Sequence, residues 1–96
     1  MPITQTQRRH LRKLAHHLKP VVIVGGAGLT PAVLEEIDGR LAHHELIKVR
    51  VNAADREERQ AMIERIAEAT GADWVLSIGH VAAFYRPAEK PGIVLP

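Results

Sequence analysis

Residues 20–41 read PVVIVGGAGLTPAVLEEIDGRL. The valines and isoleucine at residues 21–24 predict a strand buried on both faces. Three glycines within residues 25–28 then favour a tight turn. Thr30 followed by Pro31 is typical of a helix start, because threonine accepts a cap hydrogen bond and proline needs no partner at the first helical position. This stretch therefore predicts a strand, a turn and a helix in direct succession.

Two further helices are predicted on either side of this unit. Apolar residues at intervals of three and four predict a helix over residues 4–18, which ends where Pro20 follows Lys19. Another helix is predicted between an aspartate N-cap at Asp55 and a glycine C-cap at Gly71. The buried stripe of the first helix is expected to consist of Leu11, Leu14, Ala15 and Leu18.

Three more strands complete the pattern. Residues 46–51 alternate in polarity and predict a half-buried strand, with Lys48 and Arg50 on its more polar face. Residues 74–78 and 81–86 predict two strands joined by a two-residue hairpin. Two of their three aromatic residues, Trp74 and Phe84, are expected in the core.

The resulting fold class is α/β. The order α-β-α-β-α-β-β predicts a small mixed four-stranded sheet with helices packed against it, because the β-α-β units need right-handed crossovers and the hairpin adds an antiparallel strand. The 96 residues, of which 46% are hydrophobic, suit a single compact domain over residues 1–96, with an irregular tail at residues 89–96.

Composition excludes several function classes. The chain has no cysteine, which excludes disulfides, thiolate catalysis and cysteine-based metal sites. The N-terminus has no signal-peptide pattern, and the longest uncharged stretch, residues 20–34, is too short to cross a bilayer. We therefore expect a cytoplasmic protein, and a monomer because no coiled-coil pattern is present.

The charge is distributed unevenly. Residues 1–34 contain five basic residues and no acid, whereas residues 35–96 contain eight basic and eleven acidic residues. This asymmetry suggests either a polyanion-binding end or a solvated basic helix that contacts nothing. His16 lies among the basic residues, which are Arg8, Arg9, Arg12, Lys13 and Lys19.

The glycine turn also has two interpretations. It has the form G-x-x-G and consists of Gly25, Gly26, Ala27 and Gly28. Backbone N–H groups and a helix dipole at such a turn can meet a phosphate, and the same spacing occurs in the KH loop that holds a nucleic-acid backbone. Glycines in strand-to-helix turns can also serve chain geometry alone. The longer glycine motifs of nucleotide-binding folds are not completed here.

Catalysis and metal binding have little support in the sequence. The six histidines include two adjacent pairs, whose side chains point about 100° apart on a helix, and no zinc motif is present. The only serine lies in a predicted strand, and no spacing suggests a nucleophile with a base. We expect no enzyme, no cofactor and no metal.

Several longer stretches resemble one family. LRKLAHHLKPVVIVGGAGLTPAVLEEID, HHELIKVRV, IGHVAAFYRP and the closing IVLP are together similar to the YhbY family of stand-alone bacterial CRM (chloroplast RNA splicing and ribosome maturation) domains. The resemblance covers nearly the whole chain. It implies a fold like the C-terminal domain of translation initiation factor 3, RNA binding, and association with precursors of the large ribosomal subunit during ribosome assembly.

The same resemblance implies where RNA binds. The turn formed by residues 25–28 would lie on the RNA-binding surface, beside basic residues of the first helix and beside Lys48 and Arg50. Family members usually carry lysine as the second residue of the turn, where this chain has Gly26. We therefore hypothesise that the first helix carries more of the charge here. Two alternatives remain open: a protein-interaction adaptor that uses the basic helix, and a phosphate-ligand enzyme at the glycine turn.

Overall fold

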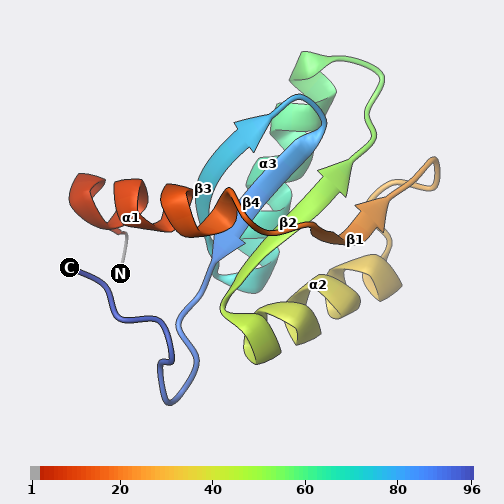
Figure 1. Ribbon diagram of the computed structural model, residues 1–96. Coiled ribbons are helices and arrows are strands. Elements are labelled where there is room, and N and C mark those ends of the chain that lie inside the picture. Colours follow the sequence, from red (N-terminus) through yellow and green to blue (C-terminus); the bar gives the residue numbers. More distant parts are fainter. Residues whose placement is uncertain (1–2) are drawn as a thin grey trace.

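The computed structural model describes residues 3–96 (Figure 1). The order α-β-α-β-α-β-β and the α/β class predicted from the sequence are confirmed. The elements are α1 (Gln5–Ala15), β1 (Pro20–Val24), α2 (Pro31–His44), β2 (Leu46–Val51), α3 (Arg56–Thr70), β3 (Asp73–Ile78) and β4 (Val81–Tyr85).

The four strands form one mixed sheet in the order β1-β2-β4-β3. β1 and β2 are parallel and connected through α2, whereas the β2–β4 and β4–β3 pairs are antiparallel. Gly79 and His80 join β3 to β4 as the hairpin pattern predicts, and Gly79 has a positive φ of 58°. β1 and β3 are therefore the two edges of the sheet.

Helices cover both faces of the sheet (Figure 1). α2 and α3 pack on one face over the larger core, where Ile37, Ile66 and Phe84 are fully buried. α1 packs on the other face, mainly against β2 and β3, over a smaller core that contains Leu11 and Ala15. The sheet thus has two helices on one face and one helix on the other, which α1 covers only in part.

The helix ends follow the predicted caps. Thr30 Oγ1 accepts a hydrogen bond from the N–H of Val33 at 3.2 Å, with Pro31 beside it in the first turn. Asp55 Oδ1 accepts from the N–H of Glu58 at 2.8 Å. Gly71 ends α3 with a left-handed φ of 73°. These contacts satisfy backbone groups that a helix end leaves without partners.

The first helix is shorter than predicted. It ends at Ala15, and the chain turns through residues 16–19 into β1. Leu11 and Ala15 are fully buried as expected, but Leu14 and Leu18 are each 38% exposed. Leu14 is at the margin of the stripe, about 100° from Ala15 around the helix, and Leu18 lies beyond the helix end.

The prediction that β1 is buried on both faces is wrong. Val22 and Val24 are buried against the larger core, whereas Val21 and Ile23 are 38% and 62% exposed. β1 is an edge strand, and α1 packs mainly on β2 and β3. Within the described residues 3–96, no helix buries the side of β1 that carries Val21 and Ile23.

The opposite edge strand gives a second correction. Phe84 is fully buried as predicted, but Trp74, expected in the core, is 36% exposed. Trp74 lies on β3, which pairs only with β4 and so leaves one side of the indole without a neighbouring strand.

A buried carboxylate fixes the C-terminal segment, which contains no helix or strand in residues 86–96. Glu45 is 6% exposed and has a left-handed φ of 66°. Its Oε2 accepts hydrogen bonds from the N–H groups of Gly92 and Ile93 at 2.9 and 3.1 Å, and its Oε1 accepts from that of Ala88 at 3.1 Å. Ile93 then packs against the core beneath α1.

Candidate nucleic-acid interface

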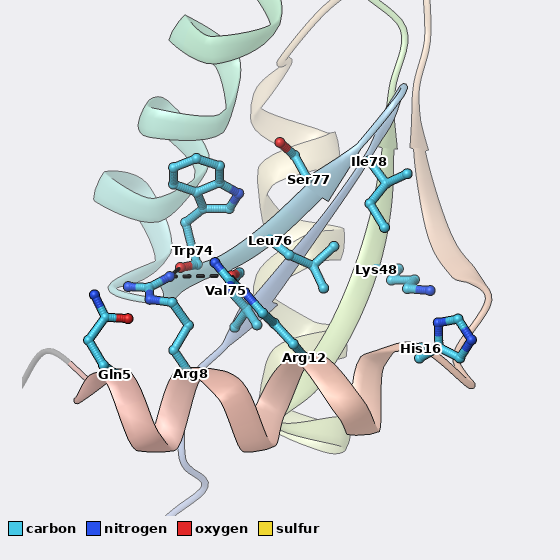
Figure 2. A pocket seen from close by; sticks show the side chains of 10 residues that line it. All are labelled: Gln5, Arg8, Arg12, His16, Lys48, Trp74, Val75, Leu76, Ser77 and Ile78. Atoms are coloured by element: carbon cyan, nitrogen blue, oxygen red, sulfur yellow. Dashed lines mark hydrogen bonds between the residues drawn. The ribbon is translucent and has the colours of Figure 1, made fainter.

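A bulge in β3 shapes the surface beside α1. The register of β3 against β4 shifts between Trp74 and Leu76. The Arg8 guanidinium donates hydrogen bonds to the carbonyl oxygens of Trp74 and Val75, and Arg12 Nε donates to that of Val75 at 3.4 Å (Figure 2). These charged donors satisfy carbonyl groups at the irregular edge and fix α1 against it.

α1 and the sheet enclose a groove with a volume of about 760 Å³, here named the α1 groove (Figure 2). Arg12 of α1 and His16, the C-cap residue that follows the helix, line one side, and Lys48 of β2 contributes from the sheet. Leu76 and Ile78 of β3 add apolar surface. The groove lining contains no carboxylate, so its chemistry favours an anionic ligand with an apolar part.

Cationic side chains continue from the α1 groove along β2. Arg50 lies two residues beyond Lys48 on the same face and pairs in register with Ile23 of β1 and Val81 of β4. Arg50 and Ile23 are both exposed, so this part of the sheet face is open. Arg50 Nε donates to Asn52 Oδ1 at 3.2 Å, near the end of the strand. Lys48 and Arg50 thus lead from α1 toward the end of the sheet where the glycine turn begins.

Gly25, Gly26, Ala27 and Gly28 form a turn at the carboxyl end of β1. The N–H of Gly28 donates to the carbonyl oxygen of Gly25 at 3.0 Å. Gly26 and Ala27, at its tip, are exposed. α2 starts three residues later, so the positive end of its dipole lies beside the turn.

Backbone geometry requires glycine at only one of the three glycine positions in the turn. Gly28 has a φ of +75°, a conformation that favours glycine. Gly25 and Gly26 lack a positive φ, and a Cβ added to either would meet no atom within 4 Å. The fold therefore does not require glycine at these two positions, and their small size leaves the backbone open to close approach.

Besides Arg50, three predicted basic residues lie outside the α1 groove. Arg9 and Lys13 are exposed on α1, and Lys19 is exposed in the connection to β1. Within residues 3–96 the one ion pair joins Arg86 to Asp38 at 2.5 Å. These three cations therefore have no carboxylate partner in that part of the chain.

Two features of this surface escape the sequence analysis. Ile23 and Ile78 have the pattern of core residues, yet they are 62% and 70% exposed because the strand order places both in the row that α1 leaves open. Arg8 and Arg12 have the pattern of free surface charges, yet both donate to β3. Their spacing of four residues predicts a shared helix face, but nothing in the sequence indicates the bulge that receives them.

The sequence of this chain matches that of a known protein family. The sequence profile of the CRS1 / YhbY (CRM) domain matches residues 3–86. The chain belongs to this family. The matched region runs from the residue before the N-cap of α1 to the residue after β4, and so includes every element that forms the candidate interface.

Relatives of this CRM domain carry names that refer to RNA. A Haemophilus influenzae protein named an RNA-binding protein is 51% identical over 94 residues, which cover 98% of this chain and 95% of the relative. The Bacillus subtilis protein YqeI, provisionally named RNA-binding, is 33% identical over 98% of this chain and 99% of its own length.

A solved structure has the same fold. The solution structure of a Staphylococcus aureus protein, provisionally described as RNA-binding, superimposes with a TM-score of 0.86 at 35% identity. The likeness covers 98% of this CRM domain and 99% of the other chain.

The described residues 3–96 contain no cluster of three or more histidine, cysteine, aspartate or glutamate side chains that could hold a metal ion. In the same range, every helix is too short or too polar to cross a membrane.

Proposed function

We propose that this protein binds structured RNA, associates with precursors of the large ribosomal subunit, and assists ribosome assembly by binding rather than by catalysis. The observation that carries the proposal is the line of cations on one sheet face. Arg12, Lys48 and Arg50 lead from α1 toward the exposed turn of residues 25–28.

The proposed contact is with the RNA backbone. Lysine and arginine side chains bind phosphates without reading sequence, and this binding weakens steeply as salt rises. The exposed turn adds backbone N–H groups and the positive end of the α2 dipole, which together favour an anion. Groove and turn would hold different phosphates of one RNA.

Family membership supports the choice of RNA. Proteins related over nearly their whole length are named RNA-binding, and their region of similarity includes the groove and the turn. The link to the large ribosomal subunit rests on the CRM family resemblance.

The test measures affinity for a large-subunit ribosomal RNA fragment across a salt series. Each phosphate neutralised adds roughly 0.7–0.9 to the magnitude of the log–log slope, so a steep slope is expected for the natural chain. The double substitution Gly26→Asp/Ala27→Asp places two negative charges at the exposed tip of the turn. A Cβ at Gly26 would meet no atom within 4 Å. We expect the double variant to fold normally and to lose affinity.

Two outcomes contradict the proposal. If the natural chain does not bind RNA, the proposal is wrong. Complexes of the protein in cell extract that survive nuclease treatment would then favour a protein partner. Binding that is indifferent to the two aspartates leaves RNA as the ligand but removes the glycine turn from the interface.

A further inference from the structure

Trp74 is the only tryptophan in the chain and lies on the edge strand β3 with 36% of its surface exposed. Its cross-strand partner Phe84 belongs to the larger core, so the indole projects on the sheet face that α2 and α3 cover. In Figure 2 the ring points away from α1. A half-exposed indole at a sheet edge offers a flat surface on which another ring can stack.

The bulge determines which side chain accompanies Trp74. Residues three apart in a regular strand point to opposite faces. Here the register shift places Trp74 opposite Phe84 and Ser77 opposite Ala82, two residues apart on β4. Trp74 and Ser77 therefore share one face, roughly 7 Å apart at about 3.4 Å per residue of the partner strand. Bulges at sheet edges commonly redirect a side chain in this way.

A second groove lies on this side of the edge strand. It has a volume of about 270 Å³ and is here named the α3 groove. Arg56, Arg59 and Gln60 of α3 line it together with Ser77, and no carboxylate is among its lining residues. Guanidinium, amide and hydroxyl groups of this kind bind phosphate oxygens and the polar edges of bases.

Arg59 retains donor capacity. Its Nη2 lies 3.2 Å from Nδ1 of His80, while its buried Nε has no hydrogen-bond partner within residues 3–96. A buried donor without an acceptor is unfavourable, and a side-chain rotation toward an oxygen of a ligand would relieve this cost.

The two grooves meet at one residue. Ser77 lines both the α1 groove and the α3 groove, on either side of β3. Because β3 is the last strand of the sheet, no further strand separates the grooves. An extended chain crossing the edge at Ser77 would pass from one basic groove into the other.

We infer that the β3 edge binds a run of unpaired nucleotides, with one base stacked on Trp74, phosphates held by Arg56 and Arg59, and the run continuing over Ser77 into the α1 groove. The inference rests on the proposed RNA binding and adds a ligand class and a surface separate from the glycine turn. A base must leave its helical stack to reach the indole, so single-stranded RNA fits this edge and duplex does not.

Charge favours RNA over a peptide strand as the occupant. Both grooves carry arginines and no carboxylate. A peptide would need a regular row of free backbone groups, whereas the bulge interrupts the edge and Arg8 already occupies the carbonyl groups of Trp74 and Val75.

The fluorescence of Trp74 can report binding of a ligand at the β3 edge. A short single-stranded oligonucleotide and a duplex of the same sequence are titrated separately while indole emission is followed. We expect the single strand to quench the emission and the duplex to have little effect. Trp74→Leu, followed by filter binding, should weaken single-strand affinity about 5- to 160-fold, the range of one base–aromatic stack, and Trp74→Phe should restore part of it.

The arginines have a matched control on the same helix. Arg56→Gln should lower the salt slope for the single strand by roughly 0.7. Arg65→Gln removes the same charge from α3 outside the α3 groove and should leave that slope unchanged.

The outcomes separate this inference from the proposed function. Normal binding of the ribosomal RNA fragment with no quenching by the single strand, or equal affinities of the natural chain and Trp74→Leu, overturns the inference alone. Failure of every RNA to bind overturns both. Quenching by a β-strand peptide, with none by RNA, replaces RNA by a protein partner at this edge.

Discussion

Arg8 donates hydrogen bonds from its guanidinium to the carbonyl oxygens of Trp74 and Val75, which joins α1 to the bulge of β3. Arg9, the next residue, is exposed on α1 and does not line the α1 groove. Neighbouring arginines of one helix therefore have different tasks. Arg8 holds the helix on the sheet, and Arg9 presents its charge to solvent.

The first prediction compares the contributions of Arg8 and Arg9 to the free energy of unfolding. Arg8→Gln removes a charged donor whose contact with Val75 is partly buried, and we expect the free energy of unfolding to fall by about 1 kcal/mol. Arg9→Gln should change it by less than about 0.5 kcal/mol, as is usual for an exposed position. Urea unfolding followed by circular dichroism measures both. Equal losses would mean that the Arg8 contacts add nothing to stability.

The second prediction concerns RNA affinity. Arg9→Gln/Lys13→Gln removes two exposed cations of α1, and we expect the magnitude of the salt slope for ribosomal RNA to fall by roughly 1.4–1.8 if both contact phosphate. Stability should stay unchanged, because neither residue has an ion pair within residues 3–96. An unchanged slope and affinity would refute the hypothesis that α1 carries much of the charge for binding.

The third prediction tests the buried Glu45. Glu45→Gln puts an amide where a carboxylate accepts three backbone N–H groups, so at least one donor of the C-terminal segment loses its acceptor. We expect a loss of about 2 kcal/mol in the free energy of unfolding and faster carboxypeptidase digestion of the tail. Glu89→Gln, at an exposed position, is the control and should change neither measurement. Equal digestion rates would show that Glu45 does not hold the tail.

Sequence patterns predicted the elements well and their exposure less well. Caps at Thr30, Asp55 and Gly71 depend on local chemistry, so they are readable from neighbouring residues. The exposure of Ile23 and Trp74 depends on strand order, which makes β1 and β3 the edges. Strand order is a property of the tertiary structure, and an apolar run of residues has the same sequence pattern in an edge strand as in a central strand.

Some features of the candidate site can likewise be predicted from the sequence, and others depend on strand pairing. Basic residues and the glycine turn are visible in the sequence, and the alternation over residues 46–51 correctly predicts a strand with Lys48 on the face opposite the larger core. The bulge is not visible, because it arises from pairing between β3 and β4. Hence the hydrogen bonds from Arg8 to β3, and the position of Trp74 and Ser77 on one face of the sheet, could not be predicted from the sequence.

The fourth prediction concerns alkaline pH. Burial raises the pKa of Tyr85 above its ordinary value of 10.0, and the carboxylates of Glu45 and Asp73 raise it further. The unfolded chain therefore ionises first, so the contribution of Tyr85 to stability is complete below about pH 10 and is lost as pH rises through its folded pKa. Urea midpoints from about pH 8 to about pH 11 should show this loss for the natural chain relative to Tyr85→Phe. Parallel curves for the two proteins would contradict it.

The last prediction adds the charge that the family usually has in the glycine turn. Gly26 is exposed, has no positive φ, and has open space where a Cβ would lie, so Gly26→Lys should leave the free energy of unfolding unchanged. If the turn faces phosphate, RNA affinity should rise and the magnitude of the salt slope should increase by roughly 0.7–0.9. Gly26→Ala separates the effect of charge from that of a side chain and should leave the slope as it is. Gly28→Ala, at a φ of +75°, should instead destabilise the fold by about 1 kcal/mol. If Gly26→Lys and Gly26→Ala have the same slope, the turn lies away from the RNA backbone and its glycines at positions 25 and 26 need another explanation.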